Sequence, residues 1–251
     1  MLTRTTATRT HRATHRALLV IGVLPTTMLT GCITSPTGSL KASLEAREMQ
    51  LDPCPGGLIE DAEDNNSQIL KNEERGGYWF TFVDEAGSTI EPHGEFTMSP
   101  GGPPGSQYAA HVKGQMAGSG ASIYAGFGFA IADPKAPYDA SKYKGVSFWA
   151  KGPGTVRFKT PDINTDPQGD RCNDCYNDFG VDIYLSEEWT RYTVPFSKMK
   201  QQSGWGDPAP AVATDGLFAI QWQYGQPDSA FDLWVDNIEF VGCWSAAEAT
   251  P

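Results

Sequence analysis

The sequence predicts an all-β protein whose main part is an antiparallel β-sandwich. Apolar and aromatic residues recur at every second position in short runs, which is the spacing of a strand with one buried face. Glycine and proline are abundant, at 27 and 18 residues, and they fall mainly between these runs, where turns are needed. No stretch of about 12 residues carries the apolar stripe of a helix. Many short strands separated by turn signals favour a sandwich.

The first 31 residues are predicted to be a secretory signal peptide. They contain four arginines, no acidic residue and an apolar run at 17–24, which is too short to cross a bilayer. The segment runs into Leu29-Thr-Gly-Cys32, which resembles the bacterial lipobox. We therefore expect Cys32 to carry a lipid that anchors the exported protein in a bacterial cell envelope, at the outer membrane or the cell surface. An ordinary signal peptide with an incidental cysteine is the alternative.

The expected mature chain is strongly acidic. The leader takes four of the 19 basic residues and none of the 30 acidic ones, so 15 basic residues remain and the net charge is −15. A surface of this sign repels phosphate backbones, so we expect no nucleic-acid partner.

Three regions are expected after the leader. Residues 32–53 are rich in Ser, Thr, Ala, Lys and Glu and lack a sustained apolar face, so we interpret them as a lipid-anchored tether. Residues 54–243 have the length of one ordinary domain, and residues 244–251 are expected to be a flexible tail.

The predicted strands follow one another along the domain. Each is rich in Val, Ile, Phe, Tyr or Trp, and most are bounded by Gly, Pro, Asn or Asp. They lie at 77–84, 108–114, 122–132, 145–152, 155–160, 179–185, 190–196, 217–224 and 231–240.

Four cysteines remain once Cys32 is assigned to the lipid. Disulfides persist in exported proteins, and four cysteines permit three pairings. We favour Cys54–Cys243, which would tie the two ends of the domain, and Cys172–Cys175, which would pinch a long loop. A zinc site or a thioredoxin-like redox pair at the second position is the alternative. Only two histidines of the mature chain are available as further zinc ligands, and no helix signal follows the motif.

Strand alternation assigns the residues of each strand to two faces. If the more apolar set is buried each time, an outward face carries polar residues, tyrosines and glycines from four strands. This face consists of Tyr124, Gly126, Gly128, Arg157, Lys159, Asp182, Tyr184, Gln221 and Gln223.

A face of this composition has the chemistry that a sugar chain requires. Sugars present weakly apolar ring faces, which stack on aromatic rings, and arrays of hydroxyls, which need donors and acceptors such as Arg, Asp and Gln. Glycines within the strands would leave the floor of a groove. A solvated strand face is the alternative, because it too is polar and contains a few tyrosines.

Several motifs occur in a fixed order along the domain. The most specific are YDASKYKGVSFWAKG at 138–152, WTRYTVPF at 189–196 and WVDNIEF at 234–240, and they are preceded by LIEDAED at 58–64. This order resembles the family 11-type carbohydrate-binding modules and their galactose-binding-like jelly-roll relatives, over about residues 58–241. The resemblance implies a jelly-roll sandwich whose concave face holds a glycan chain.

The resemblance also implies which residues bind. The Tyr, Asp and Arg positions of the family have counterparts in Tyr124, Arg157, Asp182 and Tyr184, with Gln223 and Tyr224 nearby and Trp79 at the rim. We therefore expect a non-catalytic domain that binds a polysaccharide or oligosaccharide. The loop around Cys172 departs from the family pattern, and the face lacks a run of several tyrosines, so the identity of the glycan is not predicted.

Family members commonly carry a structural calcium ion between the first and last strands. The matching carboxylates here are Glu63, or Asp61, and Asp236, completed by Asp84 and main-chain carbonyls. Carboxylate and carbonyl oxygens are the ligands that calcium prefers. The alternative is that Asp236 caps a turn and Glu63 is merely exposed.

Aspartates recur at every fourth residue from Asp162 to Asp182. The segment begins like an EF-hand loop, but its glycine, Gly169, comes two positions late and Asn173 stands where the final glutamate is required. Pro167 and Gly169 also exclude a continuous helix. We interpret the segment as a solvated acidic loop, with a second calcium site as the alternative.

No motif in the sequence indicates a catalytic site. A Ser-His-Asp hydrolase needs a histidine base, and neither His93 nor His111 is accompanied by a G-x-S-x-G motif. A small glycan-active hydrolase or lyase is a minor alternative, because 30 acidic residues offer many carboxylate pairs. The main alternative is a structural lipoprotein that uses the sandwich to bind a protein, which an exposed apolar patch at Trp205 would favour.

Overall fold

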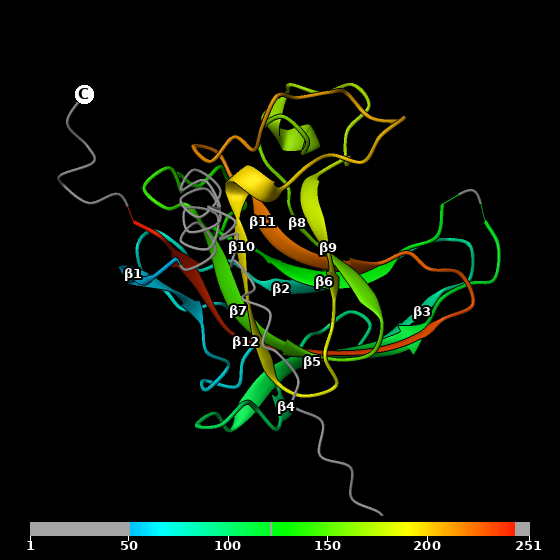
Figure 1. The fold of residues 1–251 in the computed structure, drawn as a ribbon, viewed down its shortest axis with the longest axis horizontal. Helices are drawn as coiled ribbons and strands as arrows, with labels where there is room; N and C mark the ends of the chain where they lie inside the picture. The colour runs from blue at the N-terminus through cyan, green and yellow to red at the C-terminus, as the bar shows by residue number, and fades with distance from the viewer. Residues whose placement is uncertain (1–50, 121, 244–251) are drawn as a thin grey trace, which may run out of the picture.

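The computed structural model describes residues 51–120 and 122–243, which form two antiparallel sheets packed against each other (Figure 1). In this part of the chain, helix is limited to two short 3-10 segments, η1 (Pro167–Gly169) and η2 (Phe196–Lys198). The predicted all-β sandwich is therefore confirmed. The leader, Cys32, residues 32–50 of the tether and the tail at 244–251 lie outside the described residues.

The larger sheet has seven strands and is built around β12 (Ala230–Val241), which pairs with three others. Its strand order is β10 (Thr190–Pro195), β7 (Gly145–Lys151), β12, β5 (Tyr108–Gln115) and β3 (Thr89–Glu91). Two further strands join it: β1 (Pro53–Glu60) pairs with β12, and β4 (Ser99–Pro100) pairs with β5.

The smaller sheet has five strands, in the order β2 (Trp79–Val83), β6 (Ala125–Ala130), β11 (Ala219–Tyr224), β8 (Thr155–Thr160) and β9 (Phe179–Tyr184). Its ladders are regular. For example, Trp222 lies opposite Phe127 of β6 and Phe158 of β8, so three large apolar residues share the inner face.

Every strand predicted from alternation is present, and three short or irregular strands were not predicted. In β1 the Pro-Gly-Gly sequence hides the alternation, and its pairing with β12 shifts register on both sides of Leu58. Strands β3 and β4 have three and two residues, too few to show a period.

Aromatic residues of both sheets fill the space between them. Trp222 is completely buried and meets Phe148 and Phe158 edge-on, with ring centroids 5.2 and 5.5 Å apart. Trp79 stacks on Phe127 at 5.4 Å. Such contacts contribute beyond the burial of area alone, so this cluster holds the two sheets together.

Both predicted disulfides are present. Cys54 in β1 is bonded to Cys243, just after β12, and Cys172 is bonded to Cys175 in the loop between β8 and β9. Within the described residues there is no helix whose length and apolar character would let it span a membrane.

Candidate functional site

A groove of about 770 Å³ lies on the outer face of the five-stranded sheet. Its sides come from β2, from the segment just before β6, from β8 and β11, and from two loops at 166–178 and 202–205. The residues that line it are Phe80, Phe82, Ser122, Ile123, Tyr124, Lys135, Arg157, Lys159, Pro161, Asp166, Asp174, Cys175, Tyr176, Asn177, Asp178, Gln202, Trp205, Gln221, Gln223 and Gly225.

Five of the predicted ligand-binding residues are brought together here: Tyr124, Arg157, Lys159, Gln221 and Gln223 all line the groove. They converge because β8 and β11 are adjacent in register, with Gln221 opposite Lys159 and Gln223 opposite Arg157. The outward face inferred from alternation therefore exists.

Two other predicted residues lie beside the groove. Asp182 is exposed on β9, where it faces Arg157 across the strand pair. Tyr184, at the end of β9, is 80% exposed and is not part of the lining.

The placement of Trp79 and Tyr224 in the binding site is wrong, because both belong to the core. Trp79 is 4% exposed among aromatic rings, and its indole N–H points to Glu60 at 3.4 Å. Tyr224 is also 4% exposed and stacks on Phe231 of the opposite sheet. Tyr224 has the same parity on β11 as buried Trp222, so alternation itself excludes it from the outer face.

The two glycines of β6 do not leave an open floor, as the sequence had suggested. A Cβ atom at Gly126 would lie 2.7 Å from the Phe82 ring, and one at Gly128 would lie 2.8 Å from the side chain of Gln221. The space above β6 is therefore occupied by these two neighbouring side chains, which glycine allows to lie flat on the strand.

Lys159 is a largely buried residue of the groove lining. Its Nζ lies 2.9 Å from Asp178 Oδ2 and 5.7 Å from the centroid of the Phe82 ring, and both charged side chains are largely buried. Burial raises the pKa of the Asp178 carboxyl, which the ammonium of Lys159 opposes. The ammonium thus connects β8 to an aromatic residue of β2 and to the loop before β9.

Asp178 has one oxygen without a hydrogen-bond partner among the described residues, Oδ1. The Thr165 hydroxyl lies beside this carboxyl and favours its charged form, but it is directed at Asp162 Oδ1, 3.4 Å away. A buried acceptor without a donor is unusual in a native protein.

The other cations of the groove are also paired. Arg157 Nη1 lies 3.2 Å from Asp182 Oδ1, and its Nη2 donates to the main-chain carbonyls of Lys200 and Asp178. Lys135 forms an ion pair with Asp166 and lies over the Phe218 ring. The groove therefore presents positioned donors whose charge is largely balanced by carboxylates.

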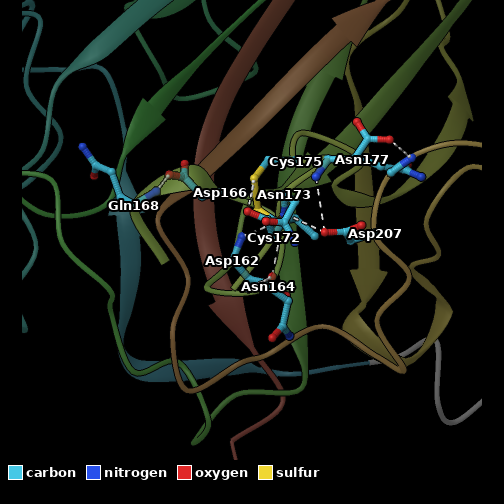
Figure 2. The surroundings of a disulfide bond; sticks show 12 residues. Asp162, Asn164, Asp166, Gln168, Cys172, Asn173, Cys175, Asn177 and Asp207 are labelled. Atoms are coloured by element: carbon cyan, nitrogen blue, oxygen red, sulfur yellow. Dashed lines mark hydrogen bonds between the residues drawn. A yellow bond between two sulfur atoms is a disulfide. The ribbon is translucent and has the colours of Figure 1, made fainter. Parts of the chain in front are cut away.

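The prediction of a solvated acidic loop at 162–182 is wrong for three of its aspartates. Asp162, Asp166 and Asp178 are all buried, at 0%, 6% and 4% exposure. Asp162 accepts hydrogen bonds from the main-chain N–H groups of Asn164 and Ala213, and Asp166 caps η1 through the N–H of Gln168 (Figure 2). These carboxylates accept hydrogen bonds from main-chain N–H groups in place of water. The hydrogen bonds hold the loop against the sheet.

Four aromatic residues of the groove were not among the predicted ligand-binding residues, and one of them, Trp205, was considered only as a patch for a protein partner. Phe80 and Phe82 share the outer face of β2, where the run Tyr-Trp-Phe-Thr-Phe has aromatic residues of both parities and alternation gives no decision. Tyr176 and Trp205 lie on loops, where no period exists. Their exposure is 66% and 45%.

The acidic residues expected to bind calcium lie in two places. Asp236 is fully buried, and burial raises its pKa to about 7, with the charges of Glu63 and Asp61 contributing. Glu63 accepts hydrogen bonds from the N–H groups of Gln107 and Tyr108, near the start of β5. Among the described residues, no three His, Cys, Asp or Glu side chains are grouped so as to hold a metal ion.

The assignment of Asp84 to the calcium group is wrong. Asp84 accepts hydrogen bonds from the Ser88 hydroxyl and the Tyr124 N–H, and Ser88 in turn accepts one from Ala117, beyond the end of β5. Asp236 lies beside Val235, which pairs with Ala110 near the start of β5. The two carboxyls are thus at opposite ends of that strand.

Comparison with solved structures gives a consistent result for the fold. The family 11 carbohydrate-binding module of the cellulosomal cellulase Lic26A-Cel5E of Clostridium thermocellum aligns with a TM-score of 0.53 and 16% identity, covering 76% of this chain and 98% of that one. The fold is that of a family 11 carbohydrate-binding module. A family 11 carbohydrate-binding module from Clostridium thermocellum in complex with a β-1,3-1,4-mixed-linked tetrasaccharide also aligns. The TM-score is 0.52 and the identity 16%, and the alignment covers 75% of this chain and 96% of that one.

A family 30 carbohydrate-binding module shares the module fold at a TM-score of 0.50, with 11% identity over 74% of this chain and 91% of that chain. No family model matches the sequence, and no curated protein matches it. The likeness is therefore one of fold.

Proposed function

We propose that the groove on the five-stranded sheet binds a polysaccharide chain and that the protein is a non-catalytic glycan-binding protein. The observation that carries this proposal is the composition of the groove. Aromatic Phe80, Phe82 and Tyr124 lie beside fixed donors on Arg157 and Lys159. Aromatic surfaces and preorganised polar groups in one groove are what a sugar ring and its hydroxyls require.

The fold supports the same proposal. A neighbour with this fold is described in complex with a β-1,3-1,4-mixed-linked tetrasaccharide. We therefore infer that a neutral, equatorially linked glucan is a suitable first ligand. The near balance of charge in the groove agrees with an uncharged ligand, because each of its cations already has a carboxylate partner.

Affinity electrophoresis of residues 33–251 through gels that contain mixed-linkage β-glucan, xylan or mannan tests the proposal. We expect retardation in at least one gel and its loss in Arg157→Ala, because Arg157 lies in the lining. Arg191→Ala is the matched control: Arg191 pairs with Glu239 on the seven-stranded sheet, away from the groove. Unchanged mobility of the folded wild-type protein in every gel would overturn the proposal.

We further propose that a calcium ion binds near Asp236, Glu63 and Asp61. Burial and the neighbouring negative charges destabilise the charged form of Asp236, and a bound cation would relieve both effects. Since the side chains alone do not form a group of three, main-chain carbonyls would complete the ligand set. The ion would hold the loop after β1 against β12.

Thermal unfolding with excess calcium, with excess magnesium and with chelator tests this site. At about 100-fold excess over Kd, a ligand specific for the native state stabilises it by about 2.7 kcal/mol. We expect calcium to raise Tm in the wild-type protein and to have less effect in Glu63→Gln. Equal Tm values in calcium and in chelator would exclude the site.

Finally, we propose that Cys32 anchors this domain in the cell envelope. Support comes from the lipobox-like Leu29-Thr-Gly-Cys32. Metabolic labelling of the full chain with a tagged fatty acid should mark the wild-type protein and leave Cys32→Ala unmarked. Label that persists in Cys32→Ala would contradict the proposal.

A further inference from the structure

Two loops at one side of the groove are joined into a single unit. One is the disulfide-containing loop at 170–178, and the other runs from 201 to 209, after η2. Figure 2 shows Asn177 and Asp207 beside the Cys172–Cys175 bond, with hydrogen bonds linking residues of this region. Neither loop belongs to the sheet, yet both supply lining of the groove.

Asn177 is the centre of this unit. It is 3% exposed, its Nδ2 donates to the carbonyls of Gln202 and Trp205 at 2.8 and 2.6 Å, and its Oδ1 accepts from the N–H of Gln202 at 2.9 Å. The Asn177 carbonyl also accepts from the side chain of Gln201. One buried amide thus satisfies three main-chain groups of the second loop.

The two loops also exchange hydrogen bonds in both directions. The Asp207 carboxylate accepts from the N–H of Asn173, and the Asp174 carboxylate accepts from the N–H of Gly206 at 2.9 Å. Gly206 has a φ of +71°, and a Cβ there would lie 2.5 Å from the Cβ of Asn177, so only glycine permits this approach. The loops are therefore built to hold one fixed arrangement.

The rigid unit holds two aromatic rings in an exposed position. Tyr176 is 66% exposed and Trp205 is 45% exposed, and both line the groove. Tyr176 has a φ of +74°, a conformation that is rare for a bulky residue, and it is kept there by the hydrogen bond from its N–H to the Thr165 carbonyl. Backbone strain that surrounding contacts maintain is commonly associated with a functional site.

We propose that this loop unit is a second, loop-built part of the ligand site, in which Trp205 and Tyr176 stack on pyranose rings of the bound chain. The inference rests on the proposed function and adds to the sheet face a set of contacts on the side of β9. Phe80 and Phe82 lie on β2, at the other edge of the sheet, so aromatic rings are available on both sides of the groove. A chain of equatorially substituted pyranoses, whose two ring faces are both apolar, is the ligand class that suits this arrangement.

Titration calorimetry with mixed-linkage β-glucan oligosaccharides tests the proposal. We expect Trp205→Ala and Tyr176→Ala each to weaken binding by about tenfold, the loss typical of one stacking contact, and Trp205→Phe to restore most of it. Ser203→Ala, an exposed substitution in the same loop and outside the lining, should bind like the wild-type protein. Because Trp205 is exposed, the ligand should also shift tryptophan emission in the wild-type protein and not in Trp205→Phe.

The outcomes separate the two proposals. If Arg157→Ala loses binding while Trp205→Ala and Tyr176→Ala keep wild-type affinity, the loop unit is not part of the site and the glycan-binding function stands. If the folded wild-type protein binds none of the oligosaccharides or polymers, the proposed function fails and this inference fails with it.

Discussion

At the scale of the residue, the structure depends on charged side chains that are buried away from water. Lys159 and Asp178 are the clearest case: they lie 2.9 Å apart, with side-chain exposures of 11% and 3%. A buried pair gains little over an apolar pair, but removal of one partner leaves an uncompensated charge. The pair therefore fixes the geometry of the groove more than it adds to stability.

Lys159→Met should lower the free energy of unfolding by about 3–5 kcal/mol, because Asp178 would remain buried without its partner. Adding Asp178→Asn should recover much of the loss. Urea denaturation of both variants measures the effect, with Lys113→Met as control, since Lys113 and Glu91 form an exposed pair. A single variant as stable as the wild-type protein would show that the pair is not buried in solution.

Glu60 makes stability depend on pH. It is fully buried, and burial raises the pKa of its carboxyl to about 7, although the N–H of Ala62 and the Trp79 indole favour the charged form. Between pH 4.5 and about 7 the native state binds more protons at this site than the unfolded chain, so stability should fall as pH rises. The expected change is on the order of 3 kcal/mol.

Urea unfolding at several pH values, in chelator so that no bound cation masks the titration, measures this slope. Glu60→Gln should reduce it between pH 4.5 and about 7. The same slope in the variant would assign the pH dependence to another group.

At the scale of the element, the start of β6 is held by the loop that follows β2. Asp84 accepts hydrogen bonds from the Ser88 hydroxyl at 2.6 Å, and from the N–H groups of Ala86 and Tyr124, both at 2.8 Å. Burial opposes its charge, but these hydrogen bonds outweigh burial and hold the pKa of Asp84 below its usual value. One carboxylate thus positions Tyr124 at the groove.

Asp84→Ala should destabilise the protein by about 2–3 kcal/mol, because it leaves buried donors without an acceptor. It should also weaken glycan binding, since the main chain at Tyr124 loses its support. Asp215→Ala, at an exposed aspartate, is the control for both measurements. Chemical denaturation gives the first quantity and calorimetry the second; unaltered values for Asp84→Ala would contradict this role.

At the scale of the whole molecule, β12 and the disulfide beside it close the sandwich. β12 pairs with β1, β5 and β7, so the first and last strands of the described residues are neighbours. The Cys54–Cys243 bond joins them across a sequence separation of 189 residues, whereas Cys172–Cys175 spans only 3. A cross-link stabilises mainly by restricting the unfolded chain, so the longer loop should contribute more.

Replacing Cys54 and Cys243 by serine should lower the free energy of unfolding by about 5 kcal/mol, against about 2 kcal/mol for the same change at Cys172 and Cys175. Guanidinium denaturation of the two double variants gives the comparison. Equal losses would show that local strain or packing, rather than chain entropy, determines the effect.

Three strands of the five-stranded sheet show how much of the site could be predicted from the sequence. In β8, Val156 and Phe158 face inward while Arg157 and Lys159 face outward, as alternation predicted, and β11 follows the same rule. In β2 both parities contain aromatic residues, so the sequence could not tell that Trp79 is buried and that Phe80 and Phe82 line the groove. Only packing against the opposite sheet decided between them.

The loops also show what could not be predicted from the sequence. The repeated aspartates at 162–178 predicted a solvated segment, because an isolated carboxylate is most stable in water. In the structure, main-chain donors that are distant in sequence, such as the N–H of Ala213, take the place of water around Asp162. The nine alternating strands therefore followed from the sequence, since alternation is a local signal, and both favoured disulfides are present in the structure. The aromatic walls and buried acids of the groove were decided by tertiary structure, since their partners come from other parts of the chain.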